Sequence, residues 1–294
     1  MTKVSRDKKS ERGMALLIVV FGLALVASVI MAISNAGRIE TLGAANLSER
    51  VQADFAADAG VAVATRALVD ASRQDAWMVD GRPVELAVDG IAVTVSVTDV
   101  SGLVDLNTGP AELLGRLLVN AGLDPAAAAI VLAAIRDWTD ADDRSPLGGD
   151  ERTAYRRAGL AYGPRNAAME SPSELMMIPG FPAELYFRIL PFITVHSGQT
   201  GIDSAVAPAE VLAAVPGIDA RTAQDLVTAR RTSGAPRTGA PLGVRRDYFE
   251  EGQRRAFAVD IAIGASYRRR TILSLGGGGR QSWRYLAQYD LPQP

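Results

Sequence analysis

An uninterrupted apolar run near the N-terminus constrains this chain more than any other feature. No charged residue occurs from Met14 to Gly37, and the stretch from Met14 to Ile33 is almost wholly apolar. At about 1.5 Å per residue, a helix of this length spans the roughly 30 Å hydrocarbon core of a bilayer. The sequence therefore predicts a transmembrane helix over residues 14–36.

The charge distribution predicts how that helix is oriented. All three lysines lie in residues 1–13, which carry a net charge of +3. Because basic flanks stay in the cytoplasm, we expect a cytoplasmic leader and a body on the opposite side of the membrane. The alternative is a secretory signal peptide cleaved after Ala36, but the apolar region of such a peptide has only about 7–15 residues.

Composition after residue 13 argues against several classes of function. The whole chain carries −2, so the part after the leader carries −5, which disfavours nucleic acid as the main partner. The chain contains no cysteine and one histidine, His196. Disulfides are therefore excluded, and Ser-His-Asp catalysis and most zinc sites are disfavoured.

The pattern of the remaining residues predicts an α+β fold. An amphipathic helix continues from residue 38 to about residue 72, and the turn Asp89-Gly90 joins two strand-like runs at residues 84–88 and 91–97. Helical patterns dominate from residue 105 to about 231, and three further strand-like runs follow at residues 257–264, 270–275 and 282–288. We expect a long N-terminal helix packed on an antiparallel β-sheet, with a large all-α domain inserted between the strands.

This organisation corresponds to five segments. They are a leader at residues 1–13, a transmembrane helix at 14–36, the helix continuation with the first hairpin at 37–104, the inserted all-α domain at 105–235, and the closing strands at 236–294.

The helical region contains two kinds of internal repeat. Asp105–Leu114 and Asp203–Leu212 align without a gap, and each contains a Pro-Ala-Glu helix start. Two Pro-Gly turns, at Pro179 and Pro216, lie between helical runs and resemble helix–hairpin–helix units. DNA-binding versions carry a second Gly in the hairpin, where this chain has Pro182 or Asp219. We therefore interpret both turns as packing units, because a carboxylate repels phosphate.

Acidic residues gather between two of the predicted helices. Five aspartates and one glutamate lie within the stretch from Asp137 to Glu151, which also contains Pro and Gly. Oxygen ligands at such short spacing suit Ca²⁺, which takes about 6–8 oxygens. The spacing does not match an EF-hand, and a solvated loop neutralised by Arg136 and Arg144 is the open alternative.

The junction between leader and apolar helix resembles a known processing site. Arg12-Gly13-Met14 is similar to the site in type IV prepilins and type II secretion pseudopilins, where a prepilin peptidase cuts after the glycine. The resemblance implies that Met14 becomes the methylated N-terminus. Most of those proteins have glutamate at the fifth mature position, where this chain has Ile18. A subunit with no neighbour ahead of it in the filament has no amine to pair with that glutamate, so Ile18 favours a tip position.

Further motifs resemble one branch of this group, the K-type minor pseudopilins of type II secretion systems (the general secretion pathway protein K family). In chain order they are Val104-Asp-Leu-Asn107, Asp137-Trp-x-Asp-x-Asp142, Gly149-Asp-Glu151, Tyr162-Gly-Pro-Arg-Asn166, Ser173-Glu-Leu175 and Ile178-Pro-Gly180. The chain departs from the family at Ile202–Ala205, where members usually have an Asn-rich turn.

The resemblance implies a structural assembly protein that is not an enzyme. It implies a bound structural Ca²⁺, for which the matching ligands are Asp137, Asp140, Asp142 and Glu151, with Asp143 and Asp150 as further candidates. It places the protein in the inner membrane by a single pass, with its body in the periplasm. The implied function is to initiate pseudopilus assembly at the tip and so support protein export across the outer membrane.

The implied partners are other minor pseudopilins in a tip complex, the prepilin peptidase and the inner membrane, with the secreted substrate as a further candidate and no nucleic acid. Two other functions are compatible with parts of the sequence. One is a membrane-anchored periplasmic helix–hairpin–helix DNA-binding protein, which requires basic residues near the Pro-Gly turns. The other is a Ca²⁺-dependent periplasmic hydrolase, which requires a nucleophile or base beside the acidic loop.

Overall fold

The structure is a computed structural model of the 294-residue chain. It describes residues 8–70, 77–142, 144, 151–233, 243–253, 255–276 and 283–291, without the side chains of residues 8–13, 15 and 32–46. The chain divides into two compact units, Met1–Phe55 and Ala56–Pro294.

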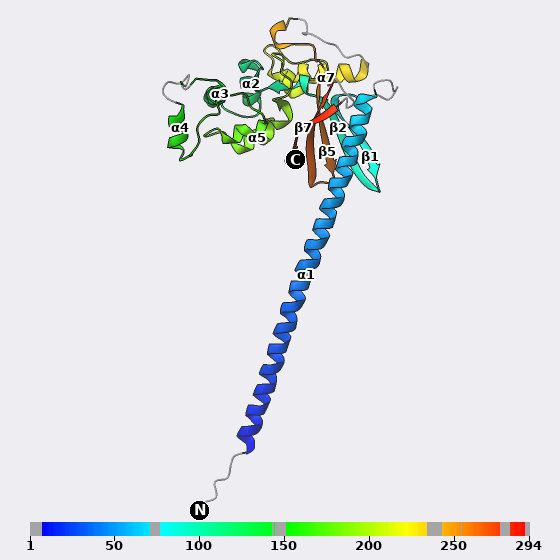
Figure 1. Ribbon diagram of the computed structural model, residues 1–294, viewed down its shortest axis with the longest axis vertical. Helices are drawn as coiled ribbons and strands as arrows, with labels where there is room; N and C mark the ends of the chain where they lie inside the picture. The colour runs from blue at the N-terminus through cyan, green and yellow to red at the C-terminus, as the bar shows by residue number, and fades with distance from the viewer. Residues whose placement is uncertain are drawn as a thin grey trace, which may run out of the picture. The chain divides into compact units, whose positions relative to one another are not determined.

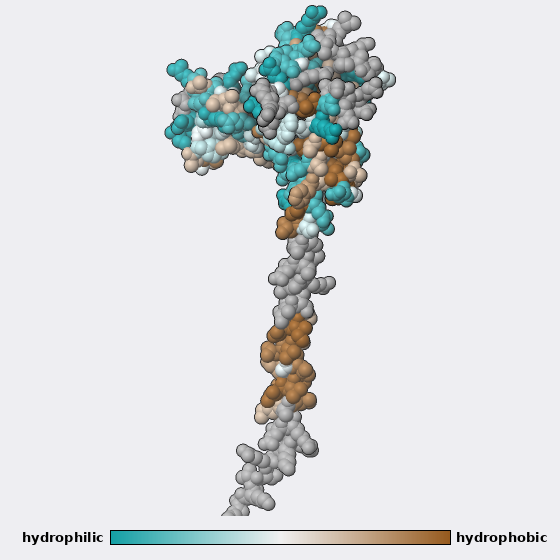
Figure 2. All heavy atoms as spheres, turned by 45° about the vertical axis from the view of Figure 1, so that its right-hand side comes forward, coloured by the Kyte–Doolittle hydropathy of each residue, from teal (hydrophilic) through white to brown (hydrophobic). Residues whose placement is uncertain are grey.

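The first unit consists of most of the long helix α1 (Lys8–Val69). The large apolar side chains described between Met14 and Met31 are all exposed, and they form the brown band on this helix in Figure 2. Among the helices whose residues are described, none is both long and apolar enough to cross a membrane. The predicted span at residues 14–36 includes Ala15 and residues 32–36, whose side chains lie outside the description. The span is therefore not confirmed and stays a prediction.

The second unit contains the antiparallel sheet expected from the sequence, which is confirmed. Its five strands lie in the order β1-β2-β5-β6-β7 (Figure 1). Their bounds are β1 (Asp80–Val88), β2 (Ile91–Asp99), β5 (Ala256–Ile263), β6 (Tyr267–Leu275) and β7 (Trp283–Asp290). Asp89 and Gly90 form the predicted turn between β1 and β2, both with positive φ (47° and 82°).

The end of α1 packs against one face of this sheet. Ala56, Ala57, Val61 and Ala64 of the helix share a buried apolar cluster with β2, β5 and β6. A Cβ placed on Gly60 would lie 3.0 Å from Ile261 Cδ1 and 3.3 Å from two valine methyl groups. The small residues of this helix face therefore allow a close helix–sheet approach, which larger side chains would prevent.

The remaining helices of the described chain lie between β2 and β5, together with three short 3-10 turns at residues 100–102, 190–192 and 246–248. They are α2 (Ala111–Asn120), α3 (Pro125–Thr139), α4 (Arg152–Arg157), η2 (Pro172–Met177), α5 (Ala183–Ile189), α6 (Ala209–Ala214) and α7 (Ala220–Ser233), with the parallel pair β3 (Val104–Asp105) and β4 (Ile193–Thr194). They enclose a separate apolar core that includes Leu113, Leu117, Leu175 and Leu212. The helical pattern predicted for this region thus forms a packed body.

The repeat in sequence is also a repeat in structure. The side chains of Asp105 and Asp203 each accept the backbone N–H two residues ahead, both at 2.9 Å. Their carbonyl oxygens each accept the N–H four residues ahead, again at 2.9 Å. A proline then precedes α2 in one copy and α6 in the other. The shared Asp and Pro therefore build the same turn into a helix twice.

Both Pro-Gly turns form the expected tight connections. Gly180 (φ 78°) lies between η2 and α5, and Gly217 (φ 90°) lies between α6 and α7, where side chains other than glycine are strained. Asp219 Oδ1 accepts the Thr222 N–H at 2.7 Å at the start of α7. This hydrogen bond is the main cause of the lowered pKa of Asp219. A carboxylate thus occupies the place where a phosphate would bind.

Candidate cation site

Two helix ends carry the acidic residues of the candidate site. Asp124 caps α3 by accepting the Ala126 N–H at 2.9 Å, and Pro125 follows at the first helical position. The helix ends at Thr139, and Asp140 adopts an extended backbone (φ −80°, ψ 168°). Helix α4 begins after Glu151. Asp140 and Asp142 therefore follow the end of α3, and Glu151 directly precedes the start of α4.

The structure brings three of the predicted ligands together. Carboxylate oxygens of Asp140, Asp142 and Glu151 all lie within 4.8 Å of one another. Oxygens bound to one Ca²⁺ at about 2.3–2.6 Å can lie up to about 5 Å apart, so the spacing fits a single ion. Glu151 is only 2% exposed, whereas Asp142 is exposed, so the cluster has a buried side and a solvent side.

The electrostatics of Asp140 also fit a cation. Its Oδ1 is buried and accepts no hydrogen bond from the described part of the chain. Burial, and next the negative charge of Asp142, raise the pKa of Asp140 above its ordinary value of 3.8. The ionised carboxylate is thus destabilised where it lies, and a bound cation would reverse that penalty.

Aromatic contacts hold the two helix ends together. The ring of Trp138, two residues before Asp140, stacks on Tyr155 of α4 with centroids 6.2 Å apart. Tyr155 in turn meets Tyr162 edge-to-face at 5.9 Å. Burial, and next the charge of Asp137, raise the pKa of the Tyr155 phenol, which therefore stays neutral. These contacts fix the positions from which the carboxylates project.

The structure places the six predicted ligands in three different ways. Asp140, Asp142 and Glu151 form the cluster. Asp137 lies on α3 near Tyr155 and is not part of that group. Asp143 and Asp150 lie outside the described residues.

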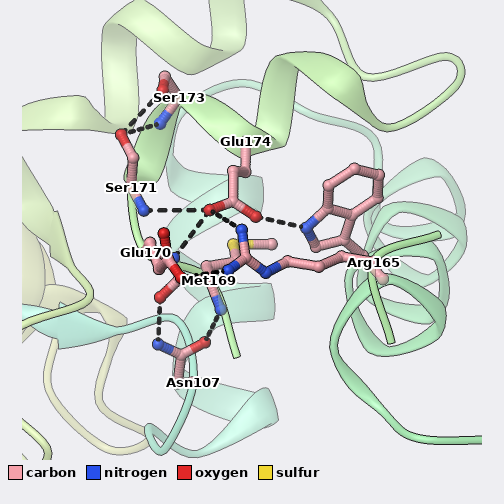
Figure 3. Close-up of polar contacts among 8 residues, drawn as sticks. Asn107, Arg165, Met169, Glu170, Ser171, Ser173 and Glu174 are labelled. Carbon is pink, nitrogen blue, oxygen red and sulfur yellow. Dashed lines mark hydrogen bonds and ion pairs between the residues drawn. The ribbon is translucent and has the colours of Figure 1, made fainter. Parts of the chain in front are cut away.

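Residues that support the cluster were noted in sequence only as motif positions. The buried Glu174 forms a capping box with Ser171 at the start of η2. It also accepts hydrogen bonds from Trp138 and Arg165 (Figure 3). Asn107 exchanges two hydrogen bonds with the backbone of Met169, at 3.0 and 2.8 Å. The sequence signal for these roles was their place in the family motifs, since Trp138 and Met169 lie 36 and 62 residues from their partners along the chain.

Comparison with known families supports the resemblance drawn from the motifs. The family model described as type II secretion system (T2SS), protein K matches residues 97–198, which include the acidic cluster. Type II secretion system protein K of Klebsiella pneumoniae is 29% identical over 212 residues, covering 65% of this chain and 64% of the relative. The same protein of Pectobacterium carotovorum is 26% identical over 211 residues, covering 63% of each. The chain thus aligns with less than two thirds of the length of these relatives.

A solved structure agrees with the fold. One chain in the crystal structure of the GspK–GspI–GspJ complex from the enterotoxigenic Escherichia coli type 2 secretion system matches with a TM-score of 0.59. The match covers 84% of this chain and 99% of that chain at 13% identity, so it bears on the fold alone. The mixed helix and sheet architecture is therefore shared with a protein of that complex.

Proposed function

We infer that this chain is a K-type minor pseudopilin of a type II secretion system, a structural assembly protein without catalysis. The observation that carries this inference is the protein K family match over residues 97–198, the segment that contains the motifs from Val104 to Gly180. The curated relatives carry the same description. The DNA-binding alternative has no support from these comparisons, and Asp219 at the start of α7 opposes it.

The proposed arrangement is pilin-like. We place residues 14–36 in the inner membrane, the leader in the cytoplasm, and the sheet with its helical insertion in the periplasm. The uncharged run in the sequence and the exposed apolar side chains from Met14 to Met31 support the anchor. The 100–255 segment between β2 and β5 supports the insertion. A body of that size obstructs a subunit ahead of it, which with Ile18 favours the tip of the pseudopilus.

The proposed cofactor is one structural Ca²⁺. Asp140, Asp142 and Glu151 would hold it, with Asp143 and Asp150 as further candidate ligands. When bound, the ion neutralises mutually repelling carboxylates and so stabilises the connection between α3 and α4. The residues present fit this role because the cluster supplies hard oxygen ligands, and the buried Oδ1 of Asp140 accepts no hydrogen bond from the residues that the structure describes.

Leader processing is the direct test of this function. In cells with the prepilin peptidase, we expect the membrane-extracted protein to lack residues 1–13 and to carry one added methyl group on Met14. Intact-mass measurement with and without the peptidase checks this. Dependence on the enzyme would support a pseudopilin. An uncut chain, or one beginning at Gly37, would contradict it.

A helix surface predicts how the chain joins its partners. Leu47, Val51 and Phe55 of α1 are 64%, 43% and 72% exposed and lie four residues apart, so they share one face of the helix. We propose that helices of other minor pseudopilins cover this apolar face, by analogy with the complex that the structural relative forms.

Phe55→Glu is therefore expected to weaken the binding free energy for the other minor pseudopilins by about 2 kcal/mol or more, because an aromatic contact is replaced by a charge. The loss should be visible as reduced co-purification. Phe187→Glu, the same change at a 45% exposed position of α5, is the matched control. Equal loss in both variants would show that the α1 face is not the contact.

A further inference from the structure

Glu174 is a buried carboxylate surrounded by hydrogen-bond donors. It is 7% exposed. Its Oε1 accepts from the Glu170 N–H at 2.7 Å, the Ser171 N–H at 3.2 Å and Arg165 Nη1 at 3.2 Å, as Figure 3 shows. Its Oε2 accepts from the indole Nε1 of Trp138 at 2.9 Å. Four donors therefore converge on one carboxylate.

The capping box explains only part of this arrangement. A capping box needs the side chain of Glu174 to accept only one hydrogen bond, from the Ser171 N–H. The Trp138 contact instead reaches 36 residues back along the chain, to the end of α3. A residue that served only η2 would have no need of it.

The segment from Arg165 to Glu174 also binds the backbone beside the acidic cluster. The Asn166 N–H donates to the Trp138 carbonyl at 3.0 Å, and Asn166 Nδ2 donates to the Asp142 carbonyl at 3.3 Å. Asn166 adopts a positive φ of 54°, a conformation that asparagine tolerates better than most residues. Trp138 lies two residues before Asp140, so these bonds flank the proposed ligands along the chain.

Asn107 binds the segment from Arg165 to Glu174 at Met169. The two hydrogen bonds between Asn107 and Met169 tie it to the loop after β3. The neighbouring Asp105 accepts five further hydrogen bonds from residues 107, 108, 197 and 198. Glu174 thus lies between the hydrogen-bonded turn after β3 and the end of α3.

We propose that Glu174 is a positioning residue for the cation site, acting through the indole of Trp138 to fix the end of α3 from which Asp140 and Asp142 project. The proposal rests on the cation binding proposed above. Groups that orient metal ligands through hydrogen bonds raise affinity because the ligands need not be ordered when the ion binds.

Glu174→Gln tests this because the carboxylate of Glu174 accepts every hydrogen bond described for it above. An amide offers one acceptor oxygen and one N–H₂ group, so whichever way it turns, N–H groups face donors. Trp138→Phe removes the indole N–H from the other side and keeps an aromatic ring beside Tyr155. Glu170→Gln is the matched control, since Glu170 contacts the same Arg165 but its side chain is 81% exposed.

Calcium titration of the full chain by isothermal titration calorimetry is the experiment. We expect Glu174→Gln and Trp138→Phe each to weaken Ca²⁺ binding by about tenfold, the double variant to be no weaker than either, and Glu170→Gln to bind like the wild type. The indole N–H resonance that Trp138→Phe removes should shift on calcium addition in the wild type. A purely structural role would predict neither that shift nor the non-additivity.

The outcomes separate the two proposals. A wild type that binds no calcium would overturn the cation site and this inference with it. A wild type that binds while Trp138→Phe binds equally well would overturn the inference alone. If Glu174→Gln fails to fold, Trp138→Phe and its resonance still decide between these results.

Discussion

Replacing Arg270 with methionine is expected to lower the free energy of unfolding by about 3 kcal/mol, because it removes a buried guanidinium with its hydrogen bonds and leaves the partly buried carboxylate of Asp260 unpaired. Arg270 is 3% exposed and pairs with Asp260 on the neighbouring strand through two hydrogen bonds, at 2.6 and 2.7 Å. Its Nη1 also donates to the Leu190 carbonyl at 3.1 Å. Burial by itself lowers the pKa of Arg270, but the charge of Asp260 outweighs it and the net shift is upward.

The position of this pair explains the size of the effect. Arg270 and Asp260 face each other across β6 and β5, and Leu190 lies at the end of α5, so one guanidinium joins the sheet to the helical region. Equilibrium urea unfolding followed by near-ultraviolet circular dichroism measures the loss. Arg284→Met, at an exposed position of β7, should change stability by less than about 0.5 kcal/mol.

A double variant distinguishes a broken pair from lost packing. Adding Asp260→Leu to Arg270→Met removes the orphaned charge, so part of the lost stability should return. If the double variant is as unstable as the sum of the two single variants, the penalty does not come from an unpaired carboxylate, and this account of the pair is wrong.

Asp140→Asn is expected to abolish the stabilisation by calcium. A ligand at about a hundredfold excess over its dissociation constant stabilises the folded state by about 2.7 kcal/mol. The wild type should show this gain in thermal unfolding with calcium relative to chelator, and the variant should show almost none. A gain of equal size in both would remove Asp140 from the ligand set.

In chelator, without calcium, Asp140 should destabilise the folded protein as the pH rises. Because the pKa of Asp140 is raised in the folded state, the folded protein holds its proton more tightly than the unfolded chain. Its contribution to the free energy of unfolding therefore falls as the pH rises from 3.8 through the raised value. Without calcium, Asp140→Asn should be more stable than the wild type at neutral pH, and the difference should narrow at acidic pH. A variant less stable than the wild type in chelator would contradict this.

Local patterns in the sequence predicted most of the elements. Asp89-Gly90 specified a hairpin because both residues tolerate positive φ, and alternating valines specified which face of β2 is buried. The Asp and Pro shared by the two repeats specified two similar helix starts, because capping depends on residues only a few positions apart. Each of these interactions is local, so the order of residues is enough to specify it.

The sequence predicted the acidic residues as candidate ligands, but which of their carboxylates lie together in the described residues depends on tertiary structure. The family resemblance implied Asp137 as a ligand, yet this residue lies one helical turn before Asp140 on α3 and is not part of the group that Asp140 and Asp142 form with Glu151. Which carboxylates meet depends on where α3 ends and how α4 returns, and those positions are set by packing between Trp138 and Tyr155.

The long-range polar contacts could not be predicted from the sequence for the same reason. Nothing near Glu174 in the chain indicates the indole of Trp138, and nothing near Arg270 indicates the Leu190 carbonyl. The sequence by itself determined the apolar N-terminal run, the α+β pattern, the turns and the family motifs, since these follow from neighbouring residues. Tertiary structure alone decided which buried charges are paired, because burial and pairing arise only when segments distant along the chain pack together.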